Sequence, residues 1–370
     1  MPRNPCQAFI HGIGVAAPAP TIGQAQAASF AGQLCGYTEQ ESAWVHRLYE
    51  RTRVRQRGCA ALNGHDSGEV GQGLFQVAQN PDDLGPGTGE RLRWYAQSAQ
   101  RLAFESASEA LERADVRGAD ITHLVTASCT GFEAPGVDVR LIDSLALDRG
   151  VARTHIGFMG CHAALNALRV ASAFVRADPR ARVLVCAVEV CSVHFHYGRR
   201  PDRMLANALF ADGSASAVLS SKPRQGSWAI RASGSHILPD SAGAMTWRIG
   251  DHGFEMSLSP ELPRLIRDNL GEWIDGWLKG CGLDRTGVAS WAIHPGGPKI
   301  LEAAAQALEL SPGALDASRA ILESHGNMSS PTVLFILDRL RAEGAHGPCV
   351  ALGFGPGLAI EGVLLDEPHR

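Results

Sequence analysis

The 370-residue sequence has no apolar run near the ~20 residues that a membrane-spanning helix requires. Its first stretch, MPRNPCQAFIHGIGVAAPAP, has prolines and a histidine where a secretory signal needs a continuous apolar region. A net charge of −4 provides no basic field that would attract nucleic acid. We therefore expect a cytoplasmic protein with no membrane span and no nucleic-acid partner.

The nine cysteines include no CxxC pair, and their number is odd. Most lie in apolar strand-like runs such as VLVCAVEVCS, which is typical of buried, inert thiols in a reducing compartment. Cys191, His194 and His196 are the residues to consider as metal ligands. In a strand, alternation would place the two histidines on one face and Cys191 on the other, so we predict no metal site.

The chain does have ample apolar material, with 45% hydrophobic and 19% charged residues. Its length is large for a single core, so two lobes or one large fused α/β domain is expected. Strand-like and helical patterns alternate along it. Expected strands are Ala8–Val15, Leu124–Ala127, Val183–Val188, Ala215–Ser220, Trp228–Ile237, Val288–Ile293, Val350–Gly353 and Gly357–Leu365. Expected helices are Glu39–Arg51, Glu90–Ala114, Pro260–Lys279, Lys299–Leu308 and Ser330–Arg341, while Gly58–Gly89 is Gly-rich and poorly periodic.

Cys161 lies in THIGFMGCHAALNALRV, where a strand-like run breaks at glycine and an alanine-rich helix begins on the cysteine. The unpaired N–H groups and the dipole at a helix N-terminus favour a thiolate, the nucleophile of acyl transfer. Taken alone, such a cysteine is more often buried and inert. His294 in AIHPGGP and Asn327 in SHGNMSSP stand in loops of the same shape, so the three residues together suggest a Cys-His-Asn site.

The chain also repeats itself at a constant spacing. Ser128 and His294, Cys161 and Asn327, and Val183 and Cys349 are each separated by 166 positions (294 − 128, 327 − 161, 349 − 183). Each pair occupies similar strand-end or helix-start blocks. The spacing indicates a duplicated α/β unit, although a chain with few element types also offers accidental matches.

Five motifs in order carry a resemblance that covers nearly the whole chain: GCHAALNALR around Cys161, LFADGSASAVL at Leu209–Leu219, HPGGP at His294–Pro298, GNMSS at Gly326–Ser330, and GFGPGL at Gly353–Leu358. The sequence resembles the type III polyketide synthases, the chalcone synthase-like branch of the thiolase superfamily. The resemblance implies a five-layered αβαβα fold of two duplicated halves and a homodimer. The halves would be residues 1–222, with Cys161, and residues 223–370, with His294 and Asn327; the segment Ser220–Ser227 joins them.

The resemblance also implies the chemistry. Cys161 would take an acyl group from a starter acyl-CoA, activated by His294 as a thiolate–imidazolium pair. His294 and Asn327 would hydrogen-bond the thioester carbonyl of malonyl-CoA and stabilise the enolate that forms as carbon dioxide leaves. The enolate would attack the acyl thioester, and the cycle would repeat. No metal or redox cofactor is expected.

Further residues match positions that the family uses around this site. Phe210 and Phe254 match two gatekeeper phenylalanines between the CoA tunnel and the reaction chamber, with ordinary core packing as the alternative. Arg47 and Arg51, four apart on one helical face, match positions that hold the CoA phosphates, with a solvated charged face as the alternative. Ser329, within GNMSS, matches a pocket position.

Several pocket positions depart from the plant chalcone synthases. Threonines are replaced by Cys129, Cys191 and His194, a methionine by Ala134, and a glycine by Met245, which puts flavonoid chemistry in doubt. Thr130, Ala134 and Cys191 instead resemble bacterial alkylpyrone and alkylresorcinol synthases, which thread a long acyl chain into a tunnel. Alanine in place of methionine removes volume that such a tunnel could use. We expect an aliphatic acyl-CoA starter and an α-pyrone or resorcinol product.

Other functions use the same residue types. A single-round FabH-like β-ketoacyl synthase shares Cys-His-Asn chemistry, but HPGGP and GNMSS weigh against it. A hydrolase of the papain kind would release free acid without consuming malonyl-CoA, and an inactive homologue would bind CoA and release nothing.

Overall fold

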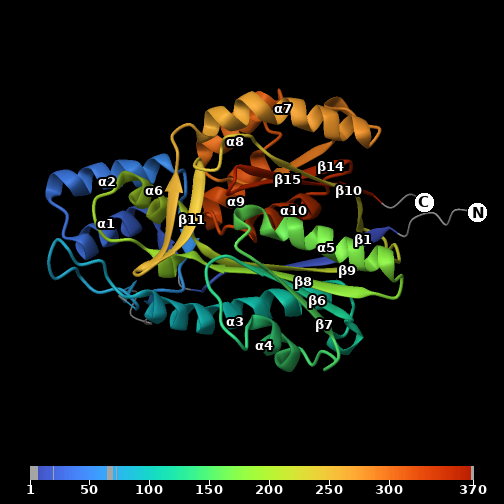
Figure 1. The fold of residues 1–370 in the computed structure, drawn as a ribbon, viewed down its shortest axis with the longest axis horizontal. Helices are drawn as coiled ribbons and strands as arrows, with labels where there is room; N and C mark the ends of the chain where they lie inside the picture. The colour runs from blue at the N-terminus through green and yellow to red at the C-terminus, as the bar shows by residue number, and fades with distance from the viewer. Residues whose placement is uncertain (1–6, 20, 65–69, 72, 368–370) are drawn as a thin grey trace, which may run out of the picture.

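The computed structural model describes residues 7–19, 21–64, 70–71 and 73–367. Helices and sheet alternate in five layers (Figure 1). One outer layer holds α3 (Thr88–Arg113) and α4 (Val137–Ser144), and the opposite one holds α7 (Leu262–Gly280) and α8 (Pro298–Ala307). The central layer holds α5 (Ala163–Ala177) and α10 (Thr332–Ala342), with half of the sheet on each side. This is the predicted αβαβα arrangement.

The main sheet has nine strands in the order β13-β14-β15-β10-β1-β9-β8-β6-β7. The first half contributes β1 (Ala8–Ala16), β9 (Asp212–Ser220), β8 (Arg182–Val190), β6 (His123–Ser128) and β7 (Ala152–Gly157). The second half contributes β10 (Trp228–Ile237), β15 (Ala359–Asp366), β14 (Cys349–Gly355) and β13 (Ser290–Ile293). A short antiparallel pairing of β1 with β10 joins the two halves.

The strand order carries the duplication seen in the sequence. Read outward from the join, β1-β9-β8-β6 in one half corresponds to β10-β15-β14-β13 in the other. Ser128 ends β6 and His294 follows β13, while Val183 and Cys349 lie at the starts of β8 and β14, as the 166-residue register requires. The 166-residue offset does not extend to every element. The residues that correspond to β7 fall in helix α9 (Asp316–His325), and β10 and β15 start 220 and 147 residues after β1 and β9 (228 − 8, 359 − 212).

The central helices are apolar nearly all round because both faces meet a sheet. In α10 the residues Val333, Leu334, Phe335, Ile336 and Leu337 are buried in succession. In α5 the small side chains of Ala163, Ala164, Ala167 and Ala171 are all buried against the sheets. A helix of this kind is stable only inside a protein, so these two elements form the centre of the core.

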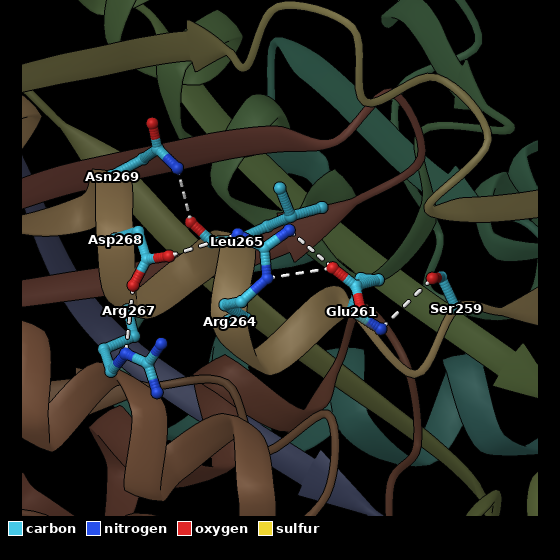
Figure 2. Close-up of polar contacts among 7 residues, drawn as sticks. All are labelled: Ser259, Glu261, Arg264, Leu265, Arg267, Asp268 and Asn269. Atoms are coloured by element: carbon cyan, nitrogen blue, oxygen red, sulfur yellow. Dashed lines mark hydrogen bonds and ion pairs between the residues drawn. The ribbon is translucent and has the colours of Figure 1, made fainter.

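The outer helix α7 shows the opposite pattern. Leu262, Ile266, Leu270, Ile274 and Leu278 recur every four residues and are buried toward β14 and β15. Its exposed face carries charged pairs in the first turns, shown in Figure 2. The Arg264 Nε atom donates to Glu261 at 2.8 Å, and its Nη1 atom lies 3.4 Å from Asp268. These exposed pairs contribute little to stability, and the apolar face holds the helix in place.

A smaller group of elements packs at one end of the layers. It contains α1 (Gln24–Cys35), α2 (Glu39–Arg51) and α6 (Pro201–Leu209), which share a separate apolar cluster. Beside them β11 (Met245–Gly250) and β12 (Gly253–Leu258) form an isolated hairpin. Short pairs link β2 (Thr21–Gly23) to β3 (Gln56–Gly58), and β4 (Asn63–Gly64) to β5 (Val70–Gly71). Helices α1, α4, α6 and α9 and the β11–β12 hairpin are absent from the sequence-based assignment.

Within the described part of the chain, no helix combines the length and the apolar character needed to cross a membrane.

Candidate active site

Cys161 lies in a 3₁₀ turn, Gly160–His162, between β7 and α5. The α-helix begins at Ala163, two residues later than the sequence pattern predicts. Gly160 has a φ of +79°, and a Cβ atom there would lie 2.5 Å from Cδ of Pro356. Only glycine fits this position, so the turn that presents the buried Cys161 side chain depends on it.

Asn327 is presented in the equivalent way in the second half. Gly326 precedes it with a φ of +75°, and a Cβ atom there would lie 3.0 Å from Cβ of Ala211. The side-chain Oδ1 of Asn327 accepts a hydrogen bond from the backbone N–H of Ser329 at 2.8 Å. The amide nitrogen is therefore the end left to donate, and Asn327 and Ser329 both interact with the Cys161 thiol.

Burial raises the pKa of the Cys161 thiol to about 12, although its interactions with Ser329 and Asn327 act in the opposite direction. The buried carboxylate of Glu189 adds to the increase. Desolvation therefore outweighs the helix N-terminus, and the resting group is a thiol rather than the thiolate predicted from the sequence.

His294 follows β13, and its backbone N–H donates to the carbonyl of Leu352 at 2.8 Å. The side chain is buried, and neither Nδ1 nor Nε2 has a hydrogen-bond partner among the described residues. Burial, with a smaller contribution from His162, lowers the pKa of His294 to about 3, so the imidazole is neutral. Unpaired nitrogens in a buried ring are costly, so this ring is available to hydrogen-bond a substrate group. No hydrogen bond joins this ring to Cys161 in the described structure.

A cavity opens over Cys161. Its wall includes most of the pocket residues expected from the sequence: Cys129, Thr130, Cys191, His194, Phe210, Met245, Phe254 and Ser329. His294, Asn327 and Ala134 are not part of this wall. Ala134 is exposed in the single chain, and its place in a tunnel stays a prediction.

Arg47 and Arg51 are both exposed on α2. Neither side chain has a hydrogen bond or an ion pair to the residues that the structure describes. On the same helix Tyr49 points inward and lines the cavity. The structure therefore places the two arginines outside the cavity, on the outer face of the helix that forms part of its wall.

The segment CSVHFH is not a strand. Cys191–His194 forms a 3₁₀ turn, so the alternation argument does not apply to it. No cluster of three or more potential metal ligands occurs among the described residues. His194 instead bonds to protein: Nε2 pairs with the carbonyl of Thr130 at 2.6 Å, and Nδ1 with the backbone N–H of Phe254 at 3.0 Å.

Two buried charged residues beside the cavity escaped the sequence reasoning. Glu189, on β8, accepts hydrogen bonds from the backbone N–H groups of Cys129 and Thr130 at 2.9 and 3.0 Å, and from the hydroxyl of Ser330 at 2.8 Å. Burial raises its pKa to about 7. Arg57 lines the cavity and donates to the carbonyl of Phe210 at 3.2 Å. Glu189 could have been found as the single acidic residue within the apolar run VLVCAVEV. Arg57 could not be singled out, because it lies in a stretch rich in arginine.

The comparisons with known proteins agree with this geometry. A 32% identical relative is the "Alpha-pyrone synthesis polyketide synthase-like Pks18" of Mycobacterium tuberculosis, with 98% of this chain and 92% of that protein aligned. "Type III polyketide synthase C" of Arabidopsis thaliana is 32% identical over 75% of each chain. The crystal structure of PKS-I from the brown alga Ectocarpus siliculosus superposes with a TM-score of 0.91, at 32% identity and full coverage of both chains.

Family models cover almost the whole sequence. Residues 2–223 match the N-terminal domain of the chalcone and stilbene synthases, and residues 229–367 match their C-terminal domain. The structure brings the side chains of Cys161 and Asn327, one from each of these parts, into contact. The chain thus belongs to the chalcone and stilbene synthase family, the type III polyketide synthases.

Proposed function

We propose that this enzyme loads an acyl-CoA starter onto Cys161 and extends it with malonyl-CoA by repeated decarboxylative condensation, giving an α-pyrone or resorcinol product. The observation that carries the proposal is the pairing of a buried thiol with the amide of Asn327, in a chain whose buried His294 has no partner for either ring nitrogen among the described residues. A nucleophile and unpaired polar groups are what acyl transfer through an oxyanion requires.

In the loading step the Cys161 thiol gives its proton to His294 as its sulfur attacks the thioester carbonyl. Burial disfavours a lone charge on either residue, whereas proton transfer between them creates two opposite charges at once. The starter's C–S bond to CoA breaks, and the departing CoA thiolate takes the proton back from the imidazolium. The acyl group remains on Cys161, and His294 is neutral again.

In the extension step the C–C bond to the malonyl carboxylate breaks, and its electron pair forms a thioester enolate. The amide nitrogen of Asn327 and one N–H of His294 stabilise the enolate oxygen. The enolate carbon attacks the acyl–Cys161 carbonyl, and the Cys161 sulfur leaves. Because decarboxylation supplies the electron pair, the proposed cycle uses no metal or redox cofactor.

The starter that the cavity favours is an aliphatic acyl chain. Part of the wall is made of apolar side chains from β2, α1, α2 and the segment that follows β3: Ile22, Ala27, Phe30, Tyr49, Leu62 and Phe75. Burying each methylene of a starter here would contribute ~0.8 kcal/mol. We name this region the α1–α2 lobe, defined by those six residues.

Arg47 and Arg51 are proposed to hold the CoA phosphates at the outer face of α2.

We also propose that the protein forms a homodimer. The edge strand β7 and the exposed side chains of Phe132 and Met159 near Cys161 provide an apolar surface that a second copy could cover. The division into residues 1–222 and 223–370 and a cytoplasmic location remain proposals of the same kind.

Incubating the purified protein with labelled malonyl-CoA and acyl-CoAs of increasing length, followed by mass identification of products, tests the function. Chains extended by two or more malonyl units support it. A single extension indicates a FabH-like synthase, and free acid without malonyl-CoA consumption indicates a hydrolase. Binding of CoA with no product indicates an inactive homologue.

A further inference from the structure

The β11–β12 hairpin forms one wall of the cavity without belonging to the main sheet. Its two strands pair only with each other, and Met245, Trp247, Phe254 and Met256 face the cavity. The position of this wall therefore depends on contacts to neighbouring segments rather than on a sheet ladder. Trp247 supplies one of them, with its Nε1–H donating to the carbonyl of Cys129 at 2.7 Å.

His194 supplies a second contact and connects the hairpin to the floor of the cavity. Because its Nδ1 faces the N–H of Phe254, this nitrogen must accept, and Nε2 must donate to the carbonyl of Thr130. The imidazole also stacks on the Phe254 ring, with centroids 4.2 Å apart and planes inclined by 15°. One side chain thus fixes both the backbone and the ring of Phe254.

His196 completes the arrangement from the same segment of the chain. Its Nε2 lies 2.8 Å from the carbonyl oxygen of Phe254 and donates to it. Its own backbone is held by Asn207, whose Oδ1 accepts from the His196 N–H at 3.0 Å and whose Nδ2 donates to the His196 carbonyl at 2.7 Å. The N–H and the carbonyl of Phe254 are therefore hydrogen-bonded to His194 and His196. Thr130 and Asn207 in turn hold these two histidines.

We propose that His194 and His196 are positioning residues that hold Phe254 and the hairpin wall at a set distance from Cys161, and so limit how far the chain can grow. The proposal rests on the proposed function for its consequence in product length. The position of the wall, which is the geometric part of the proposal, does not rest on the proposed function. Neither histidine is assigned a part in bond making.

The main test uses His194→Phe, which keeps an aromatic ring against Phe254 and removes both hydrogen bonds. Accessibility of Cys161 is measured first, as the rates of alkylation by iodoacetamide and by a bulky maleimide, with the modified site located by peptide mass mapping. We expect the rate with the bulky reagent to increase about tenfold and the rate with the small reagent less than threefold. This measurement needs no condensation activity, so it separates failure of this proposal from failure of the proposed function.

A double-mutant cycle then asks whether the effect passes through Phe254. A Phe254→Ala background keeps the backbone hydrogen bond to His194 and loses the stacked ring. On it, His194→Phe should change the bulky-reagent rate and the product-length distribution by a smaller factor than in the wild type. If the effects of the two substitutions on the alkylation rate simply multiply, as for independent sites, the proposal is overturned.

His196 provides a second route if His194→Phe does not fold. His196→Gln can still donate to the Phe254 carbonyl and should keep the wild-type alkylation ratio and product lengths, whereas His196→Leu should shift both. Equal behaviour of the two variants would contradict the proposal. The matched control is His11→Phe, which removes a buried histidine bonded to Ser220 in the main sheet, away from the hairpin, and should leave both readouts unchanged.

Discussion

Asn327 and Phe210 are partners in an isolated parallel β-bridge. The N–H of Asn327 donates to the carbonyl of Leu209 at 2.9 Å, and its carbonyl accepts from the N–H of Ala211 at 2.8 Å. Backbone hydrogen bonds thus fix Asn327, which we propose stabilises the enolate, relative to Phe210 at the cavity wall. A shift of one would displace the other, which links the shape of the cavity to the geometry of the chemistry.

Replacing Cys161 by alanine is expected to abolish acyl loading and all chain extension, because alanine has no nucleophile and no tether for the growing chain. Intact-protein mass spectrometry with an acyl-CoA should show an adduct on the wild type only. An adduct that persists on the variant, or that maps to Cys129 or Cys191, would remove Cys161 from its proposed role.

Asn327→Ala and His294→Ala are expected to differ in which step they impair. Losing one donor to the enolate oxygen typically lowers the rate ~10²–10³-fold, so Asn327→Ala should slow malonyl-CoA decarboxylation by this factor while loading stays within a few-fold. His294→Ala should impair both steps, because the thiol then lacks its proton acceptor. Single-turnover loading and carbon dioxide release measure the two steps separately, and equal loss of loading in both variants would contradict these roles.

The turns and strands that present the site residues could largely be predicted from the sequence, because they depend on local sequence patterns. The glycines before Cys161 and Asn327 mark turns, and the apolar runs at Val183 and Cys349 mark buried strands, so the duplicated register appears without coordinates. Helix α1 was missed because its alanines, Gln24 and Gly32 give no contrasting apolar face, even though tertiary contacts bury them. The hairpin was missed because its strands lack a place in the main sheet.

The shape of the cavity could not be predicted in the same way. Its α1–α2 lobe brings Ile22 and Ala27 to the same cavity as Cys191 and Phe254, residues far apart in the chain. The pKa of Cys161 likewise depends on burial beneath other segments, which reversed the expectation of a thiolate drawn from the helix start. The resemblance to bacterial synthases predicts that Ala134 lines a tunnel, and in the single chain this residue is exposed.

Substituting Arg47 and Arg51 together by alanine should raise KM for acyl-CoA substrates several-fold with little change in kcat. The reason is that exposed arginines interact with phosphates through a field that salt screens, so the effect should shrink as ionic strength increases. A starter thioester of N-acetylcysteamine, which has no phosphates, should be used equally by variant and wild type. Arg93→Ala, an exposed arginine on α3, is the matched control; an equal KM change there would point to a general charge effect.

Acidification should destabilise the wild type more than His194→Phe. Burial lowers the pKa of His194 to about 3 in the folded protein, below its ordinary value of 6.5, so the unfolded chain binds one more proton between these pH values. The stability that this residue contributes is present above pH 6.5 and is lost as pH falls toward 3. The variant lacks this group, so the gap in unfolding free energy between the two proteins should narrow by about 2 kcal/mol from pH 7 to pH 5. Urea unfolding at several pH values measures it, and a constant gap would contradict a neutral buried His194.

Ala27→Phe should reduce the use of long acyl starters much more than short ones. Ala27 lies on the wall of the α1–α2 lobe, and an aromatic ring there would occupy space that a hydrocarbon chain needs. Each methylene kept out of the lobe loses ~0.8 kcal/mol, so kcat/KM should fall roughly fourfold per excluded methylene beyond a threshold length. Ala25→Phe, on the exposed face of the same helix, should treat all lengths as the wild type does. If Ala27→Phe folds and shows no length dependence while Ala134→Phe does, the acyl chain lies on the side that the sequence first indicated, and the lobe is not its binding site.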